Sequence, residues 1–250
     1  IEAGAAGDSA NGGSKNVSYD PRRRAVKGTT LAGPALAAVG DMQERFGRFA
    51  EQLVLAIAPR YRPGLSRARA SFRPVEIAGR VTSWRKDDRR RHVDAFPSSP
   101  TGGARILRVF TNVDRHGTAR VWRVGPDFES YAGTFLPRAG RPLPGMASAM
   151  ALLGLTKSRR TLYDQTMLAL HDAAKRDLAW QQTAPSEEVA FPPDRVWMVY
   201  TDQVPHAALS GRNALEQTFS VSPEVLAHPE DAPLAILSRL SQQDMASTLF

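Results

Sequence analysis

Apolar residues in the first quarter of the chain recur at spacings of three and four. This spacing predicts a helix over residues 35–58 with one apolar face, and Pro59 is expected to end it. The face consists of Val39, Met42, Phe46, Phe49, Leu53 and Ile57. A stripe of this kind is typical of a helix packed on a core. Residues 1–30, rich in Gly, Ala and Ser, are expected to be loosely ordered.

The period changes to two further along, which predicts barrel strands over about residues 71–124 and 196–221. The clearest candidate strands are 92–96, 105–112, 119–124, 196–201 and 214–221. Helical periodicity returns in an insert over about residues 146–182 and in a short helix over 233–240. We therefore predict a mainly β fold with flanking helices, in a single domain over residues 31–250. The expected architecture is a double-stranded β-helix, a jelly-roll or cupin-like barrel.

Candidate chemistry lies on two of the predicted strand regions. His92 and Asp94 are two residues apart, so on a strand both side chains point to one face. His206 follows 112 positions after Asp94. Two imidazoles and one carboxylate are the ligand set that leaves coordination positions open on a non-haem Fe(II). A His-x-Asp triplet is common by chance, and Asp202, four residues before His206, is a competing carboxylate.

Composition narrows the functional classes. The chain has 250 residues and no cysteine, which excludes disulfides and thiolate chemistry. It lacks a Gly-rich phosphate loop, a Gly-x-Ser-x-Gly turn and a His-Glu-x-x-His pair, so a nucleotide-binding enzyme, a serine hydrolase and a zincin are unsupported. The longest aliphatic run, residues 53–58, is too short to span a bilayer, and we expect no transmembrane segment.

The positive charge is concentrated in one segment. The chain carries a net charge of +8, and residues 60–91 contain eleven Lys or Arg against three Asp or Glu. This excess indicates either an anionic partner or a solvated basic face. Aromatic residues are scarce in the segment and no nucleic-acid motif accompanies it, so no nucleic-acid partner is expected. On charge alone, an anionic lipid headgroup or a sugar acid fits.

Longer motifs resemble those of the bacterial Kdo hydroxylase family from about residue 15 to the C-terminus. They occupy residues 71–80, 83–88, 92–97, 106–112, 121–125, 153–160 and 201–208. The resemblance implies an Fe(II)- and 2-oxoglutarate-dependent dioxygenase that uses O2, with ascorbate as a supporting reductant. It implies hydroxylation of C3 of the outer Kdo sugar on the Kdo-lipid A precursor of lipopolysaccharide, giving Ko. His92, Asp94 and His206 would be the metal ligands and the catalytic centre.

The same resemblance implies a peripheral enzyme at the cytoplasmic face of the bacterial inner membrane. Its substrate would be the Kdo-containing lipid A precursor at the membrane surface. Sugar carboxylates and lipid phosphates suit Arg and Lys. We therefore predict that the substrate is recognised by Arg85, Lys86 and Arg90, the cations nearest the metal strand, with Arg159 and Arg160 as the alternative.

The position of the Arg that would bind 2-oxoglutarate departs from the wider superfamily pattern. Many 2-oxoglutarate oxygenases place an Arg about ten residues after the distal His, but residues 215–218 here contain none. We predict Arg108 instead, because it lies fourteen positions after Asp94 and shares strand parity with Ile106 and Phe110. Arg123 is the second candidate cation, and Gln217 is the expected polar partner. His116 is expected in a turn, and His171 on a helix surface or half-buried.

Two other functions remain open from the sequence. The chain could be a 2-oxoglutarate oxygenase for another acidic glycan or for a protein side chain. It could instead be a non-catalytic, lectin-like barrel that binds anionic glycan or lipid through the basic segment. The latter makes His92, Asp94 and His206 incidental and predicts no bound metal.

Overall fold

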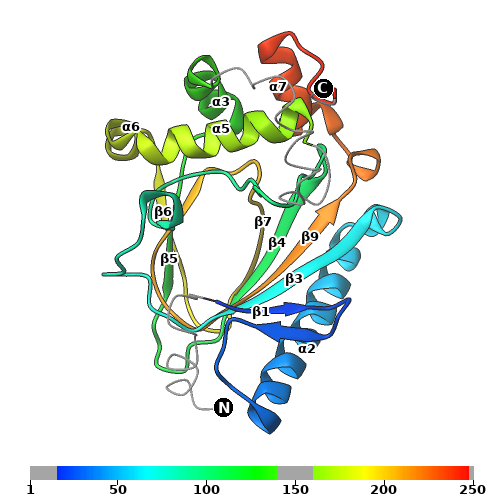
Figure 1. Cartoon of the computed structure of the whole chain (residues 1–250), viewed down its shortest axis with the longest axis vertical. Coiled ribbons are helices and arrows are strands. Elements are labelled where there is room, and N and C mark those ends of the chain that lie inside the picture. The colour runs from blue at the N-terminus through cyan, green and yellow to red at the C-terminus, as the bar shows by residue number, and fades with distance from the viewer. Residues whose placement is uncertain (1–15, 140–159, 248–250) are drawn as a thin grey trace.

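The computed structural model of the chain describes residues 16–139 and 160–247. Two antiparallel sheets form its frame, with strand orders β2-β1-β3-β9-β4-β7 and β6-β5-β8. The strands are β1 (Val17–Asp20), β2 (Ala25–Lys27), β3 (Leu65–Arg73), β4 (Arg105–Asn112), β5 (Arg120–Val124), β6 (Glu187–Phe191), β7 (Val196–Tyr200), β8 (His206–Ser210) and β9 (Ala214–Val221). The two sheets face each other as the halves of a jelly roll (Figure 1), which confirms the predicted mainly β architecture.

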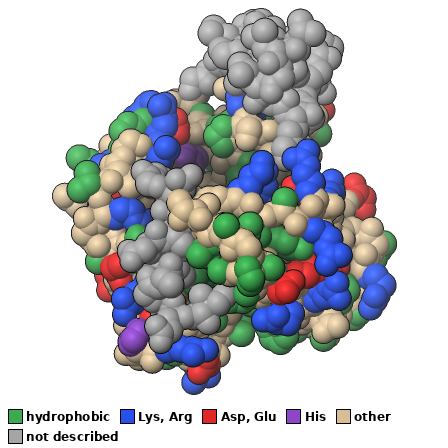
Figure 2. Space-filling model, turned by 60° about the horizontal axis from the view of Figure 1, so that its bottom comes forward, with side chains coloured by type: hydrophobic (Ala, Val, Ile, Leu, Met, Phe, Trp, Pro, Cys, Tyr) green, Lys and Arg blue, Asp and Glu red, His purple; other side chains and the backbone are tan. Residues whose placement is uncertain are grey.

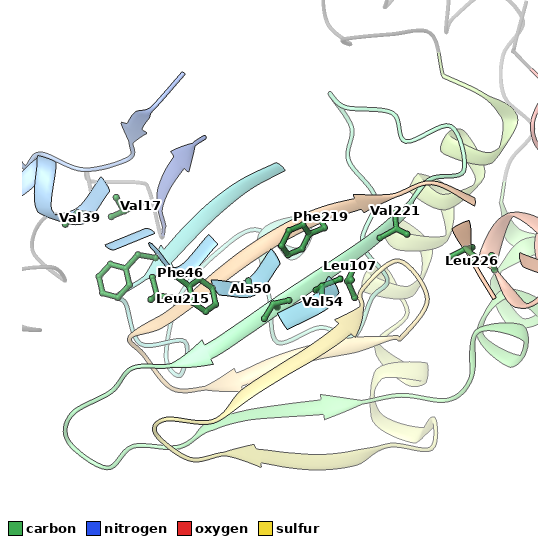
Figure 3. Close-up of a cluster of buried hydrophobic side chains, with 13 residues drawn as sticks. Val17, Val39, Phe46, Ala50, Val54, Leu107, Leu215, Phe219, Val221 and Leu226 are labelled. Carbon is green, nitrogen blue, oxygen red and sulfur yellow. The ribbon is translucent and has the colours of Figure 1, made fainter. Parts of the chain in front are cut away.

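Helix α2 (Gly33–Ile57) covers the outer face of the larger sheet, close to the predicted bounds. Its buried face packs on alternate residues of β4 and β9, as Figure 3 shows. This core includes Val39, Phe46, Ala50 and Val54 of α2 with Leu107, Val109, Leu215, Phe219 and Val221 of the sheet. Two members of the predicted stripe do not join it, since Phe49 and Ile57 are 47% and 62% exposed. The helix therefore contacts the sheet through a narrower face than its hydrophobic pattern predicts.

The remaining helices gather at one end of the barrel (Figure 1). They are α3 (Phe128–Phe135), α5 (Leu162–Arg176), α6 (Leu178–Thr183) and α7 (Pro233–Ser241). A second core of their apolar side chains includes Tyr131, Phe135, Leu170 and Leu237. Helix α5 begins at a capping box in which Thr161 and Asp164 satisfy each other's backbone amides. Helices α5 and α6 lie within the predicted insert, whose residues 146–159 lie outside the described residues.

The predicted loose N-terminus is wrong for residues 17–27. Strands β1 and β2 extend the larger sheet, and Val17 and Tyr19 are 1% and 4% exposed. Alternate apolar residues let this short segment bury one face against α2 and β3. Residues 1–15 lie outside the described part of the chain.

The predicted strand at 92–96 is also wrong as a strand. Between β3 and β4 the chain forms only an isolated bridge from His92 to His206 and the 3₁₀ turn η2 (Trp84–Lys86). Further 3₁₀ turns are η1 (Pro59–Tyr61), η3 (Leu136–Arg138), η4 (Pro223–Val225) and η5 (Pro229–Asp231). Strand β6 was not predicted, and β8 lies within the predicted strand region 196–221 without separate bounds, whereas β4 and β9 match their predicted bounds. Within the described ranges, we find no helix with the length and apolar character needed to cross a bilayer.

Candidate active site

Side-chain alternation divides the larger sheet into two faces. Leu107 and Val109 of β4 point toward α2, whereas Arg108 and Phe110 point into the barrel. An aromatic cluster of Phe110, Trp122 and Trp197 fills part of the interior. Arg108 therefore shares a strand face with Phe110, as predicted. Polar residues beside this cluster face the enclosed interior of the barrel.

His92, Asp94 and His206 come together in this interior. One ligand atom from each lies within 4.8 Å of the others, and His92 Nε2 is 3.7 Å from Asp94 Oδ1. Reciprocal backbone hydrogen bonds join His92 to His206: the His92 amide donates to the His206 carbonyl at 3.0 Å, and the His206 amide donates to the His92 carbonyl at 2.9 Å. The Asp94 amide donates to the Thr201 carbonyl at 2.7 Å. A local bridge, not a continuous strand, thus brings the predicted ligands together.

Both imidazoles have the tautomer that a metal ligand needs. Nδ1 of His92 lies 2.7 Å from the Arg90 carbonyl oxygen, and Nδ1 of His206 lies 2.8 Å from that of Val204. A carbonyl oxygen can only accept, so each Nδ1 carries the proton and each Nε2 keeps its lone pair. Burial also lowers the pKa of His92 and His206, which keeps both rings neutral at pH 7. The donor set therefore fits a divalent metal ion.

The two candidate carboxylates have different partners. Burial by itself would raise the pKa of Asp94, but Arg108 and the two imidazoles outweigh it and lower that pKa. Arg108 Nη2 lies 2.8 Å from Asp94 Oδ2. Asp202 is instead paired with buried Arg105 at 2.7 Å, and burial raises its pKa. The geometry thus favours Asp94 over Asp202 as the metal-binding carboxylate.

A buried group of arginines lies next to Asp94. Arg73 Nε donates to Glu216 at 2.7 Å, and Arg108 Nη1 lies 3.1 Å from the other oxygen of Glu216. Arg120 is 2% exposed, and burial, reinforced by the neighbouring Arg73, lowers its pKa to about 9. Three guanidinium groups therefore lie close to the carboxylates of Asp94 and Glu216, and Asp88 also acts on Arg73 and Arg120. Buried guanidinium groups of this kind are suited to binding the carboxylate of a ligand through charge-assisted hydrogen bonds.

Buried donors without acceptors point to the same conclusion. Several buried donors in the described part of the chain have no hydrogen-bond partner, and Trp122 Nε1, Arg108 Nε and Arg120 Nε are the ones on the inward faces of β4 and β5 that concern this site. The Trp122 ring stacks on that of His206, with ring centroids 5.0 Å apart. Buried donors are normally satisfied. A small dianion with carboxylate oxygens would fit these donors, so this part of the barrel interior suits a dicarboxylate such as 2-oxoglutarate.

Several of these residues were not predicted from the sequence. Strand alternation places four of them on the interior face: Arg73, Arg120, Trp122 and Glu216. Alternation could have found them only if the inward-facing side of each strand had been known. His171 of α5 was expected at a surface or half-buried. Its side chain is 16% exposed and its ring meets the His92 ring edge-on, with centroids 5.1 Å apart.

Two predicted cosubstrate contacts are corrected by the structure. Arg123 lies on the face of β5 opposite Trp122 and pairs with exposed Glu188 at 2.5 Å. Gln217 points toward α2, where its Nε2 donates to the Ala68 carbonyl at 3.1 Å. Odd-numbered residues of β9 face the helix, so the polar partner on the interior face is Glu216.

Part of the basic segment is used inside the fold. Arg90 donates to the Lys175 carbonyl at 2.7 Å, and Arg91 is 1% exposed and donates to carbonyls at the end of α6. Arg85 and Lys86 remain exposed on η2. The alternative Arg160 is 7% exposed, and Arg159 lies outside the described residues. Figure 2 shows basic side chains interspersed with acidic ones on the face in view, not one continuous basic surface.

We expect the stability of the metal-free protein to fall as the pH drops from 7.5 to 5.5. Folding lowers the pKa of His92 and His206 below the ordinary value of 6.5, so the unfolded chain binds more protons below that pH. Their contribution is present above pH 6.5 and is lost as the pH falls below it. Thermal unfolding at both pH values would measure this difference. A double variant, His92→Gln with His206→Gln, should show a smaller difference, and an equal one would contradict the assignment.

Comparisons with known proteins agree with this geometry. A family model described as 3-deoxy-D-manno-oct-2-ulosonic acid (Kdo) hydroxylase matches residues 6–244. A search of curated proteins gave no match. The apo structure of the Kdo hydroxylase KdoO, a non-haem Fe(II) α-ketoglutarate-dependent dioxygenase, is 44% identical with a TM-score of 0.91, covering 95% of this chain and 79% of KdoO.

Two ligand-bound structures of KdoO are equally similar, both at 44% identity. The complex with α-ketoglutarate, which is 2-oxoglutarate, and Fe(III) has a TM-score of 0.90 and covers 93% of this chain and 79% of KdoO. The cobalt(II) complex has a TM-score of 0.92 and covers 97% and 81%. Because the family model spans nearly the whole chain and the similarity to KdoO is this extensive, the protein belongs to the Kdo hydroxylase family of jelly-roll dioxygenases.

Proposed function

We propose that this protein hydroxylates C3 of the outer Kdo sugar on a Kdo-lipid A precursor, using Fe(II), 2-oxoglutarate and O2. The observation that carries the proposal is that His92, Asp94 and His206 come together beside the buried guanidinium groups of Arg73, Arg108 and Arg120. A set of metal-binding side chains alone would fit many functions. Membership in the Kdo hydroxylase family supports Kdo as the proposed substrate.

The protein residues have separate roles in this proposal. His92, Asp94 and His206 would hold the iron. Bound iron would activate O2, which is the oxidant: 2-oxoglutarate would give up two electrons on conversion to succinate and CO2, and the substrate C–H would give up two on conversion to C–OH. Ascorbate would be a supporting reductant. Arg108 binds the distal carboxylate of 2-oxoglutarate, Arg73 and Arg120 add positive charge beside it, and Trp122 offers its indole N–H. The aromatic cluster keeps water from this part of the pocket.

Substrate recognition would involve the exposed cations next to the metal cluster. Arg85 and Lys86 lie on η2, and the Arg85 carbonyl accepts from Lys175 Nζ at 2.8 Å. Lys175 in turn lies on α5 one turn after His171, which contacts His92. Arg90 anchors this arrangement through the Lys175 carbonyl. The enzyme would act peripherally at the cytoplasmic face of the inner membrane, where such a lipid precursor is accessible.

The direct test is turnover by the purified protein with Fe(II), 2-oxoglutarate and O2. Succinate should form, and the Kdo-lipid A precursor should gain one oxygen atom by mass spectrometry. A precursor lacking Kdo is the control and should give only slow, uncoupled succinate formation. Equal stimulation by a Kdo-free acidic glycan or a peptide would favour another substrate. A protein prepared without air that binds no metal would favour a non-catalytic barrel.

We expect Arg85→Gln and Lys86→Gln to raise the KM for the Kdo-lipid A precursor while uncoupled 2-oxoglutarate decarboxylation is unchanged. A charge-assisted contact contributes about 1.5–3 kcal/mol, hence a rise of roughly ten- to a hundredfold for a direct contact. A simultaneous fall of both activities would assign these residues to support of the metal site. If neither the KM for the Kdo-lipid A precursor nor the uncoupled decarboxylation changes, Arg85 and Lys86 belong to a solvated face.

A further inference from the structure

Trp84 of η2 is in contact with two guanidinium groups. The guanidinium carbon of Arg85 lies 4.5 Å from the indole centroid, and that of Arg176, at the end of α5, lies 4.7 Å from it. The two carbons are therefore at most about 9 Å apart. Cation–π contacts hold both groups in place on one aromatic platform. A phosphate between them could contact both, because guanidinium groups pair with phosphate oxygens in a planar, bidentate manner.

The charge of this cluster is only partly neutralised. Arg85 Nε lies 3.0 Å from Asp172 Oδ2. Among residues 16–139 and 160–247, Arg176 has no carboxylate within ion-pair distance, and Arg176 is exposed. Lys86, also exposed, adds a third cation in the same turn. The guanidinium groups of Arg85 and Arg176 are thus accompanied by one carboxylate, Asp172, and the exposed Arg176 gives the site a positive charge open to solvent.

The cluster adjoins the metal site. Asp172, the partner of Arg85, also lies 3.0 Å from Nδ1 of His171. The His171 ring contacts that of His92, with ring centroids 5.1 Å apart. A ligand held at Trp84 would therefore be a neighbour of a substrate at the metal centre, two side chains away.

Exposed apolar residues flank the cluster in the sequence. Val81, three residues before Trp84, is 97% exposed, and Leu178, two residues after Arg176, is 57% exposed. Figure 1 shows the loop between β3 and β4 beside α6 at one side of the molecule. Cations next to exposed aliphatic side chains and a half-buried indole are the combination that suits the interface of an anionic membrane. This composition favours a phosphate carried by a lipid over a soluble phosphate.

We propose that Trp84, Arg85 and Arg176 form a binding site for a lipid-borne phosphate at the entrance to the active site. The proposal rests on the proposed function, because it concerns the phosphorylated lipid portion of that substrate. The site positions the lipid headgroup while the sugar occupies the metal centre. Val81 and Leu178 contact the lipid surface around it.

The test is binding to neutral phosphatidylcholine vesicles with and without phosphatidic acid, measured by cosedimentation. The wild-type protein should bind only the vesicles that contain phosphatidic acid. Arg176→Gln should weaken that binding about fivefold, the effect of one cation at an anionic surface. Trp84→Leu should weaken it further because both guanidinium groups lose their platform, and Trp84→Phe should restore part of it. The matched control is Arg48→Gln on α2, which removes one exposed cation from an i,i+4 pair and should leave binding unchanged.

Equal effects of Arg176→Gln and Arg48→Gln would overturn the proposal, since binding would then follow net charge alone. Val81→Ser should weaken vesicle binding, and no effect there, with inorganic phosphate competing fully, would contradict a lipid-borne ligand. The assay uses neither iron, 2-oxoglutarate nor Kdo. Failure here with normal Kdo hydroxylation therefore rejects only this site, and vesicle binding without hydroxylation rejects only the proposed function.

Discussion

Replacing Asp94 by Asn is expected to abolish metal binding and to reduce turnover by at least about a thousandfold. The metal supplies several kcal/mol of the rate acceleration, and each 1.36 kcal/mol is a factor of ten. Asn keeps the shape of the side chain but removes the negative charge that lies 2.8 Å from Arg108 and completes the ligand cluster. Titration with Fe(II) under anaerobic conditions, together with succinate formation, measures both effects. His92→Ala and His206→Ala should have the same outcome.

Asp202→Asn is the matched control for this experiment. Asp202 is 1% exposed and neutralises Arg105, so its loss leaves a buried charge unpaired and costs about 3–5 kcal/mol of stability. We expect a lower melting temperature with retained metal binding. The assignment of Asp94 would be rejected by the reverse pattern, in which the Asp202 variant loses the metal and the Asp94 variant keeps it.

Arg108→Ala is expected to raise the KM for 2-oxoglutarate by about ten- to a hundredfold. One bidentate, charge-assisted contact with a carboxylate contributes roughly 1.5–3 kcal/mol. Arg108 also contacts Asp94 and Glu216, so metal affinity has to be measured alongside the kinetics. A KM increase with unchanged metal affinity identifies a direct cosubstrate contact.

Arg123→Ala provides the comparison for Arg108. Its side chain is 36% exposed and pairs with Glu188, and exposed pairs of this kind contribute about 0–1 kcal/mol. The KM for 2-oxoglutarate should therefore stay near the wild-type value. An unchanged KM in Arg108→Ala would instead move the carboxylate contact to Arg73 or Arg120.

Gln217 was assigned to the wrong face of its strand. Alternation along a single strand does not tell which face points into the barrel until the neighbouring strands are known. Gln217 and Glu216 are adjacent on β9, and a shift of one residue exchanges the helix-facing and interior faces. The helix-facing residues of β9 are apolar apart from Gln217, whereas the interior-facing residues include Glu216 and Thr218, because the barrel interior is itself charged. The usual rule that the apolar face of a strand points into the barrel is therefore reversed here, since the apolar face of β9 packs on α2. Only the pairing of β9 with β3 and β4 decides which face points into the barrel.

The segment between β3 and β4 shows a second limit. It contains the metal ligands His92 and Asp94, yet it forms no regular strand beyond one bridge. Its conformation is stabilised by contacts to distant residues, such as the four carbonyl contacts that Arg91 makes at the end of α6. Local propensity does not encode such contacts. This is also why part of an Arg-rich stretch, which indicated either an anionic partner or a solvated face, is buried inside the fold.

The sequence by itself determined the elements with strong periodicity and the chemistry of the metal site. The spacing of apolar residues predicts helix α2 and strands β4 and β9, because such spacing depends on local geometry. Residue type indicates the ligands His92, Asp94 and His206, because it sets the donor atoms. Tertiary structure alone decided which cations face the interior, since the same guanidinium group binds a cosubstrate, a carbonyl or solvent according to its environment. Arg73 and Arg120 are buried beside Glu216 and Asp94, while Arg123, on the same strand as Arg120, is half-exposed beside Glu188. Burial, and with it the strength of each charge interaction, arises only when distant strands pair.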